Sequence, residues 1–232
     1  MKELFDARVT DILRTVQAAG FTCVIVGGAV RDALRGVAPG DYDLAAGAST
    51  AQLLALLQDA EATGGEYGTV TLQKGGLRCE ITPFRAEGSY SDGRHPDRVD
   101  FAATVEEDLC RRDFTVNAMA YSPRRGLVDC FGGAEDLRKG VIRCVGRPER
   151  RFAEDALRIL RGLRFAASLG FAVEEHTARA MEEHRRALDA VSAERVAVEL
   201  RKLLCAPGAG RVLMEHTRVL GQVLPELLPM EG

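Results

Sequence analysis

The sequence predicts an α/β domain followed by an all-helical domain, and three observations support this division. Of the 24 glycines in the 232-residue chain, eighteen lie at or before Gly146, where short apolar runs alternate with turns. Several of these runs are β-branched and short, which is typical of buried strands. From Pro148 onward, apolar residues recur at helical spacing instead. We therefore expect one domain over residues 1–146 and a helical domain over residues 147–232.

The elements of the first domain follow from local signals. Apolar positions at helical spacing over 4–16 predict a first helix that stops at Gly20. The run 21–26 predicts a strand that ends at Gly27-Gly28. A capping box that begins at Thr104 predicts the start of a later helix. Helices are also expected over 29–35, over 50–57 with Thr50 as the cap and over 135–139, and strands at 42–45, 67–72, 77–84, 118–121, 127–128 and 141–145.

The second domain is expected to be helical throughout. Its predicted helices lie near residues 152–168, 174–188, 192–204 and 208–219. Within the first domain, residues 85–98 are polar and rich in Gly, Ser, Asp and Pro, which indicates a loop.

Composition excludes several classes of protein. With 46% hydrophobic and 28% charged residues, the chain is typical of a globular protein. No apolar run approaches the roughly 20 residues that span a bilayer, and the N-terminus lacks the pattern of a signal peptide. We therefore expect a cytoplasmic protein without a membrane partner. The six cysteines form no C-x-x-C pair, which disfavours a zinc site and a disulfide framework.

Positive charge is concentrated in one segment, although the net charge of the chain is −3. Residues 124–164 contain eleven Lys or Arg and six acids, a local excess of five. The segment is either an anion-binding surface or an ordinary solvated helix face.

Asp41 and Asp43 are the first candidate catalytic residues. Side chains at i and i+2 of a strand point to the same face, so the two carboxylates lie close together. Such a pair is a natural ligand set for Mg²⁺, and in two-metal sites it serves an in-line displacement. By itself, D-x-D is more often a turn or a solvated pair.

The preceding segment strengthens the catalytic interpretation. The predicted strand ends at Gly27-Gly28, and a helix with Arg31 follows. Glycines allow the backbone to approach phosphate oxygens closely, and Arg31 adds positive charge. The segment matches neither the Walker loop nor the dinucleotide-binding pattern. Glycines that hold a triphosphate, followed by acids that hold a metal, form the arrangement that a nucleotidyltransferase needs.

The chain resembles the class II tRNA nucleotidyltransferases (CCA-adding enzymes) and the bacterial poly(A) polymerases. Seven matching segments occur in the same order, and the resemblance extends over nearly the whole chain. They are 27–32, 41–43, 80–85, 106–118, 129–133, 151–161 and 194–200.

The resemblance implies a polymerase-β-like nucleotidyltransferase head with a mixed sheet, followed by a helical neck and the start of the body, without the family's tail. It implies a Mg²⁺-dependent enzyme that adds CMP and AMP from CTP and ATP to the 3′ end of tRNA. Asp41 and Asp43 would bind the metal, and Glu80 is either a third carboxylate or a paired structural acid. The residues implied to bind the nucleotide are Gly28, Arg31, Arg112, Asp155, Arg158, Arg161 and Arg164.

Asp155 and Arg158 have two interpretations. Their spacing is that of an ordinary i,i+3 salt bridge. The resemblance implies instead that they read the base, because cytosine and adenine each present an amino donor beside a ring-nitrogen acceptor. A carboxylate next to a guanidinium matches that pattern, whereas guanine and uracil present the reverse.

The resemblance also leaves alternatives for the activity. Residues 87–96 resemble the flexible loop that accompanies the switch from adding C to adding A, which argues for CCA or A addition. The nearest rival is A-only or poly(A) addition, and the second is a fragment that binds nucleotide or RNA without catalysis.

Overall fold

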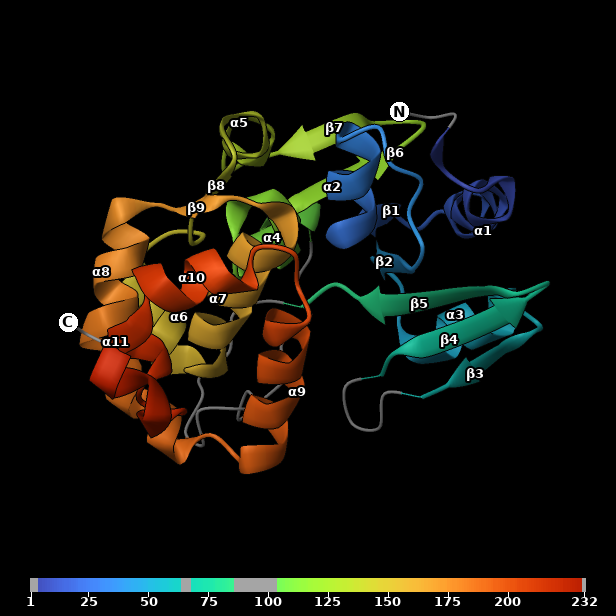
Figure 1. The fold of residues 1–232 in the computed structure, drawn as a ribbon. Helices are drawn as coiled ribbons and strands as arrows, with labels where there is room; N and C mark the ends of the chain where they lie inside the picture. Colours follow the sequence, from blue (N-terminus) through green and yellow to red (C-terminus); the bar gives the residue numbers. More distant parts are fainter. Residues whose placement is uncertain (1–3, 64–67, 86–103, 231–232) are drawn as a thin grey trace. The chain divides into compact units, whose positions relative to one another are not determined.

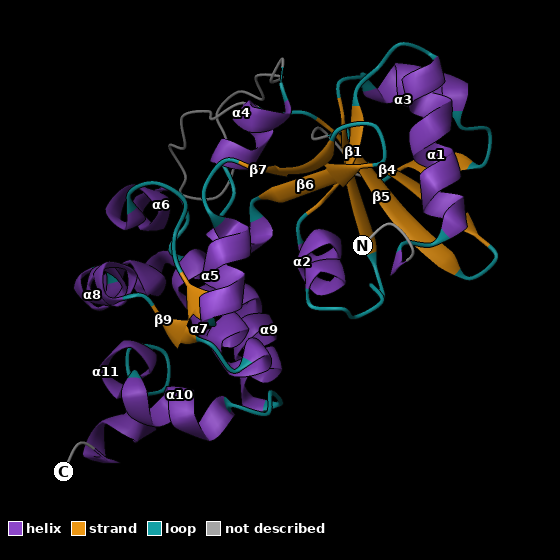
Figure 2. Ribbon diagram, turned by 90° about the horizontal axis from the view of Figure 1, so that it is seen from above, coloured by secondary structure: helices purple, strands orange, loops and turns teal. Residues whose placement is uncertain are grey.

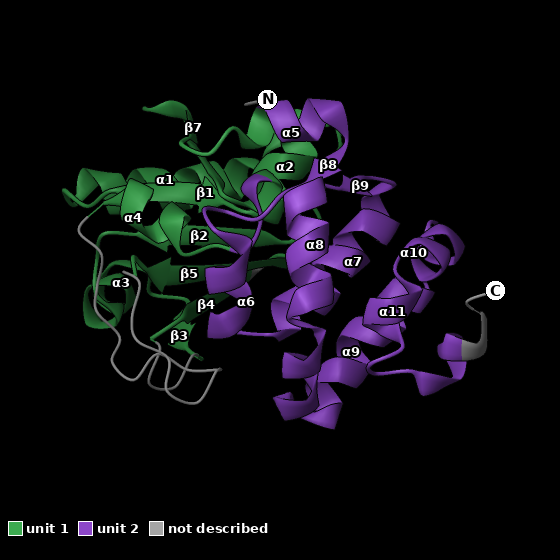
Figure 3. Ribbon diagram, turned by 90° about the vertical axis from the view of Figure 1, so that its left-hand side faces the viewer, with its two compact units in different colours: residues 1–89, 96–112, 116–134 green, residues 90–95, 113–115, 135–232 purple. Residues whose placement is uncertain are grey.

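The computed structural model describes residues 4–63, 68–85 and 104–230. These residues form two compact units (Figure 3). Unit 1 holds the described residues up to 85 together with 104–112 and 116–134, and unit 2 holds 113–115 and 135–230. The domain boundary expected between residues 146 and 147 stays a prediction, because compact units need not fold independently. The loop expected at 85–98 lies, apart from Arg85, outside the described residues.

Unit 1 contains a mixed sheet, which in the described residues has seven strands in the order β3-β4-β5-β2-β1-β6-β7 (Figure 1). Strands β2 and β5 are parallel, and the other neighbours are antiparallel. The strands are β1 (Cys23–Val26), β2 (Tyr42–Ala46), β3 (Ala60–Ala62), β4 (Val70–Lys74), β5 (Leu77–Pro83), β6 (Met119–Ser122) and β7 (Gly126–Asp129).

Helices cover both faces of this sheet. On one face, Val105 and Leu109 of α4 pack against Val24, Val26 and Ala120. On the other face, the ring of Phe5 stacks on Tyr121 with centroids 5.1 Å apart, and α1 and α3 lie side by side (Figure 2). The helices of unit 1 are α1 (Ala7–Ala18), α2 (Gly28–Leu34), α3 (Thr50–Leu56) and α4 (Val105–Cys110).

The N-terminal caps of α3 and α4 can be compared with the caps that the sequence predicts. The capping box of Thr104 and Glu107 is confirmed at the start of α4. For α3 the predicted cap was wrong: Ser49, not Thr50, caps the helix, because Ser49 has extended backbone while Thr50 is already helical. The Ser49 hydroxyl accepts the Gln52 N–H at 3.3 Å, and the Gln52 side chain accepts the Ser49 N–H at 2.8 Å.

Unit 2 is mainly helical. Over residues 104–230 the chain passes between the units after Arg112, within η3 (Thr115–Asn117) and within α5 (Gly133–Lys139). The remaining elements are β8 (Val141–Ile142), α6 (Pro148–Glu154), α7 (Leu157–Leu169), β9 (Ala172–Val173), α8 (Glu175–Glu183), η4 (Arg185–Ala190), α9 (Ala193–Leu204), α10 (Ala209–Glu215), α11 (Thr217–Leu220) and η5 (Pro225–Met230). No helix in the described ranges has the length and apolar content needed to cross a membrane.

Unit 2 departs from the sequence prediction in four places. The helices expected near 174–188 and 208–219 are each divided, the first into α8 and η4 and the second into α10 and α11. The strand expected at 141–145 is only the two-residue β8, which pairs in parallel with β9, an unpredicted strand that is too short to show a period. The helix expected near 152–168 is interrupted, because Asp155 adopts extended backbone with φ −155° and ψ 104°. The Asp155 carboxylate then accepts the N–H of Leu157 at 3.1 Å, which satisfies a donor at the start of α7.

Candidate active site

Asp41 and Asp43 flank Tyr42, the first residue of β2, so Asp43 lies within the strand and Asp41 directly before it. Both side chains are exposed, and they alternate with the buried side chains of Tyr42 and Leu44. Among the described residues, neither carboxylate has a hydrogen-bond or ion-pair partner. Two neighbouring carboxylates without a cation repel each other, so this pair fits a bound divalent cation.

The environment of Asp43 supports the same interpretation. Partial removal from water raises the pKa of this carboxyl, Arg112 opposes the shift, and the negative charges of Glu80 and Asp41 add to it. Glu80 is the register partner of Asp43 in the parallel β2–β5 pair, so both side chains lie on the same face of the sheet.

Glu80 also forms an ion pair with Arg78 at 2.7 Å. Its role as a third metal ligand therefore stays a prediction. In the part of the chain that the structure describes, no group of three His, Cys, Asp or Glu residues is placed to hold a metal ion. Asp41 and Asp43 stay the candidate ligands of a divalent cation, which prefers oxygen donors of this kind.

The glycine turn begins beside this acid pair. Val26, the last residue of β1, is the register partner of Asp43, and Gly27 follows it with φ +69° and ψ −131°. The Gly27 N–H donates to the Met119 carbonyl at 3.2 Å, which ties the turn to β6. A Cβ at Gly27 would lie 3.2 Å from Nη1 of Arg112. Glycine is thus required here both for the backbone conformation and for the close approach of the arginine.

Two predicted arginines flank the turn. Arg31 Nη2 would lie 3.5 Å from a Cβ at Gly28. Its guanidinium donates to the Asn117 side-chain oxygen at 2.7 Å and to both Asp32 carboxylate oxygens at 3.0 and 3.1 Å. Arg112 donates from Nη2 to the Asp108 carboxylate at 3.0 Å. The structure thus brings Asp43, Gly28, Arg31 and Arg112 together in unit 1.

Sequence reasoning missed the residues that hold these arginines. Asp32 and Asn117 contact Arg31, and Asp108 contacts Arg112. A signal for Asp108 was present, because it lies three residues after Val105 and one before Leu109 and so falls on the apolar face of its helix. A charged residue on such a face needs a partner. No comparable local signal marks Asn117.

In unit 2, Asp155 and Arg158 do not form the ion pair that their spacing suggested. Asp155 accepts from Arg195 at 2.8 Å, and Arg158 donates to Glu154 at 2.5 Å and to the Arg151 carbonyl at 3.1 Å. The spacing argument was wrong because it assumed one continuous helix. The extended backbone at Asp155 turns its side chain away from the i,i+3 position.

The other two predicted neck arginines are also anchored. Arg161 donates from Nε and Nη2 to the buried carboxylate of Asp113 at 2.9 and 2.6 Å. Arg164 donates to Glu199 at 2.6 Å, and its guanidinium lies 3.9 Å from the centre of the Phe165 ring. Burial opposes ionisation of Asp113, but Arg161 overcomes it and lowers the pKa of that carboxyl. The nucleotide-binding roles of these arginines stay predictions.

The basic segment 124–164 is extensively paired. Ten of its eleven cations form an ion pair with an acid, several of them with Glu154. This pairing favours the interpretation as a network of ion pairs over that of an uncompensated anion-binding surface.

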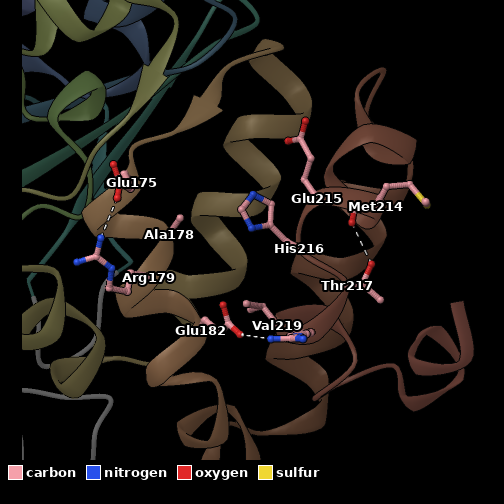
Figure 4. A pocket seen from close by; sticks show the side chains of 10 residues that line it. Glu175, Ala178, Arg179, Glu182, Met214, Glu215, His216, Thr217 and Val219 are labelled. Carbon is pink, nitrogen blue, oxygen red and sulfur yellow. Dashed lines mark hydrogen bonds and ion pairs between the residues drawn. The ribbon is translucent and has the colours of Figure 1, made fainter. Parts of the chain in front are cut away.

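Unit 2 also contains a pocket of about 660 Å³ bordered by α8, α10 and α11 (Figure 4). An ion pair between Glu175 and Arg179 at 2.8 Å lies at its edge, and Met214 and His216 contribute further side chains. None of the predicted site residues lines this pocket.

Comparison with family models decides the family. Residues 23–143 match the Poly A polymerase head domain, and residues 170–230 match the probable RNA- and SrmB-binding site of polymerase A. The chain belongs to the poly A polymerase head-domain family. The resemblance found in the sequence is thereby confirmed.

Relatives of this family member include CCA-adding enzymes. The CCA-adding enzyme of Leuconostoc mesenteroides is 44% identical over 212 residues, which is 91% of this chain and 52% of the relative. That of Streptococcus thermophilus is 46% identical over 200 residues, or 86% of this chain and 50% of the relative. The chain thus spans about half the length of the curated relatives that it matches.

Solved structures of CCA-adding enzymes are similar in fold to this chain. The Bacillus stearothermophilus CCA-adding enzyme in complex with CTP gives a TM-score of 0.81 at 38% identity and covers 88% of this chain and 50% of that one. The Thermotoga maritima CCA-adding enzyme complexed with tRNA gives 0.78 at 28% identity, covering 95% and 53%. The predicted fold class, a polymerase-β-like nucleotidyltransferase head with a mixed sheet and a helical neck, is confirmed.

Proposed function

We propose that this chain is a Mg²⁺-dependent tRNA nucleotidyltransferase that transfers CMP and AMP from CTP and ATP to the 3′ end of tRNA and releases pyrophosphate. One observation carries the proposal: the register of β1 and β2 puts Asp43 beside Val26, the residue before the glycine turn. Candidate metal ligands and a candidate phosphate site therefore adjoin on one sheet. The similarity to CCA-adding enzymes supports the choice of substrates.

The residues of unit 1 have separable tasks in this reaction. Arg31 and Arg112 would bind triphosphate oxygens at the glycine turn, where their side chains are already held by Asn117 and Asp108. Asp41 and Asp43 would hold Mg²⁺, which when bound promotes ionisation of the attacking 3′-hydroxyl and neutralises the leaving phosphates. The reaction forms a bond from the 3′ oxygen to the α-phosphorus and breaks the bond from that phosphorus to the pyrophosphate.

Base choice would rest on Asp155 and Arg158. A carboxylate offers about four lone pairs, and Asp155 uses one for Arg195 and one for the Leu157 N–H. The remaining acceptors would take the amino group of cytosine or adenine. Arg158, which now donates to Glu154, would supply the donor for the ring nitrogen.

A product-length assay tests this function. The protein is incubated with Mg²⁺, a tRNA that ends before CCA, and each nucleoside triphosphate alone and in combination. CTP alone should extend the tRNA by C residues, and CTP with ATP should complete CCA. Extension by ATP without any use of CTP would establish A-only or poly(A) addition, and no extension would leave a fragment that binds without catalysis. Cytoplasmic location belongs to this proposal, because tRNA and both nucleotides are available there.

A further inference from the structure

Asp108 has an unusual position for a charged residue. Its side chain is 1% exposed, and it lies on the face of α4 that packs against the sheet. Burial raises the cost of its negative charge, but Arg112 and Arg111 outweigh this cost and lower the pKa of the carboxyl. Asp108 is therefore ionised in the folded protein.

The Asp108 carboxylate accepts hydrogen bonds from three residues. Arg111 donates from Nη2 at 2.6 Å, Arg112 donates from Nη2 at 3.0 Å, and the backbone N–H of Arg85 donates at 3.2 Å. One carboxylate thus faces two guanidinium groups, and the group of three side chains keeps a net charge of +1.

Arg112 has donors that Asp108 does not satisfy. Its Nε is buried and has no hydrogen-bond partner within the described residues. Its Nη1 lies 3.2 Å from where a Gly27 Cβ would be, and its charge acts on Asp43. An unsatisfied buried donor is destabilising. A ligand with oxygen acceptors next to the glycine turn would give this guanidinium further partners.

We infer that Asp108 is a positioning residue for nucleotide binding: it holds Arg112 against Gly27, so that the remaining guanidinium donors face the phosphate oxygens of the incoming nucleotide. The inference rests on the proposed function for the identity of the ligand. Asp108 itself touches neither the nucleotide nor the metal ligands. Its effect passes through Arg112.

Binding of inorganic tripolyphosphate, measured by titration calorimetry without tRNA, tests this role apart from catalysis. Asp108→Asn should bind about tenfold more weakly than the wild type, because Arg112 loses its charged anchor. Asp136→Asn is the matched control, since Asp136 is also a buried acid, bonded to Thr115 and Arg143. This control should keep the wild-type affinity even if it lowers the melting temperature.

A double-mutant cycle separates positioning from a general structural effect. In an Arg112→Ala background, Asp108→Asn should change tripolyphosphate affinity less than twofold, because the residue through which it acts is gone. An undiminished effect in that background, or unchanged affinity in the single variant, would overturn the inference.

If Asp108→Asn does not fold, Arg112→Lys decides the question. Lysine keeps the charge but lacks the planar fork that can bond Asp108 and a phosphate together. We expect about tenfold weaker binding, and wild-type affinity would refute the role of Asp108. A protein that binds tripolyphosphate through this pair but transfers no nucleotide would refute the proposed function alone.

Discussion

Replacing Gly27 with alanine tests the glycine turn most directly. The residue has φ +69° and ψ −131°, a conformation that costs a residue with a side chain about 1–3 kcal/mol. The new Cβ would also lie 3.2 Å from Arg112 Nη1, so the guanidinium must move by a few tenths of an ångström. The moved guanidinium would lose part of a charged hydrogen bond to phosphate, so we expect tripolyphosphate affinity to fall by about three- to tenfold.

Gly36 provides the matched control. Its φ is +77°, but in the described part of the chain no atom lies within 4 Å of a Cβ built there. Both alanine variants should therefore unfold at lower urea concentration than the wild type. Only Gly27→Ala should also bind tripolyphosphate more weakly in a calorimetric titration. Equal affinity in the two variants would refute the idea that Arg112 and the turn form one phosphate site.

Three further outcomes are expected. Asp43→Asn should lower nucleotide transfer by several powers of ten without lowering the melting temperature, because it removes a charge that Glu80 and Asp41 repel; near-normal turnover would contradict the metal assignment. Asp155→Asn should reduce the preference for CTP and ATP over UTP and GTP, and unchanged ratios of kcat/KM for the four nucleotides would contradict a role in base choice. Burial lowers the pKa of His216, so unfolding takes up a proton just below pH ~6.5, and stability should fall as pH drops through that range. Urea titrations at several pH values should show a smaller fall for His216→Gln.

Local signals in the sequence predicted much of unit 1. The D-x-D pattern predicted two neighbouring acids at a strand, and the structure has Asp43 in β2 and Asp41 directly before it, where its charge acts on Asp43. The glycine pair marked the end of β1, and Thr104 marked the start of α4. These features depend on residues that lie within a few positions of one another, so local patterns in the sequence reveal them.

The missed features depend on contacts between distant residues. Arg195 lies 40 residues from Asp155, and Asn117 lies 86 residues from Arg31. No periodicity links such pairs before the fold is known. The break at Asp155 was missed for a related reason: Ala156, Ile159 and Leu160 continue the apolar pattern, so hydrophobic spacing alone shows no interruption there.

The central place of β2 in the sheet has a consequence for backbone dynamics. It is the fourth of the seven described strands and is bonded on both sides, to β1 and to β5. Its amides should exchange with deuterium only when unit 1 opens as a whole, unlike those of β3 and β7 at the sheet edges. We therefore expect the backbone that carries Asp43 to be among the best protected in unit 1 and to keep its position whether or not a ligand is bound.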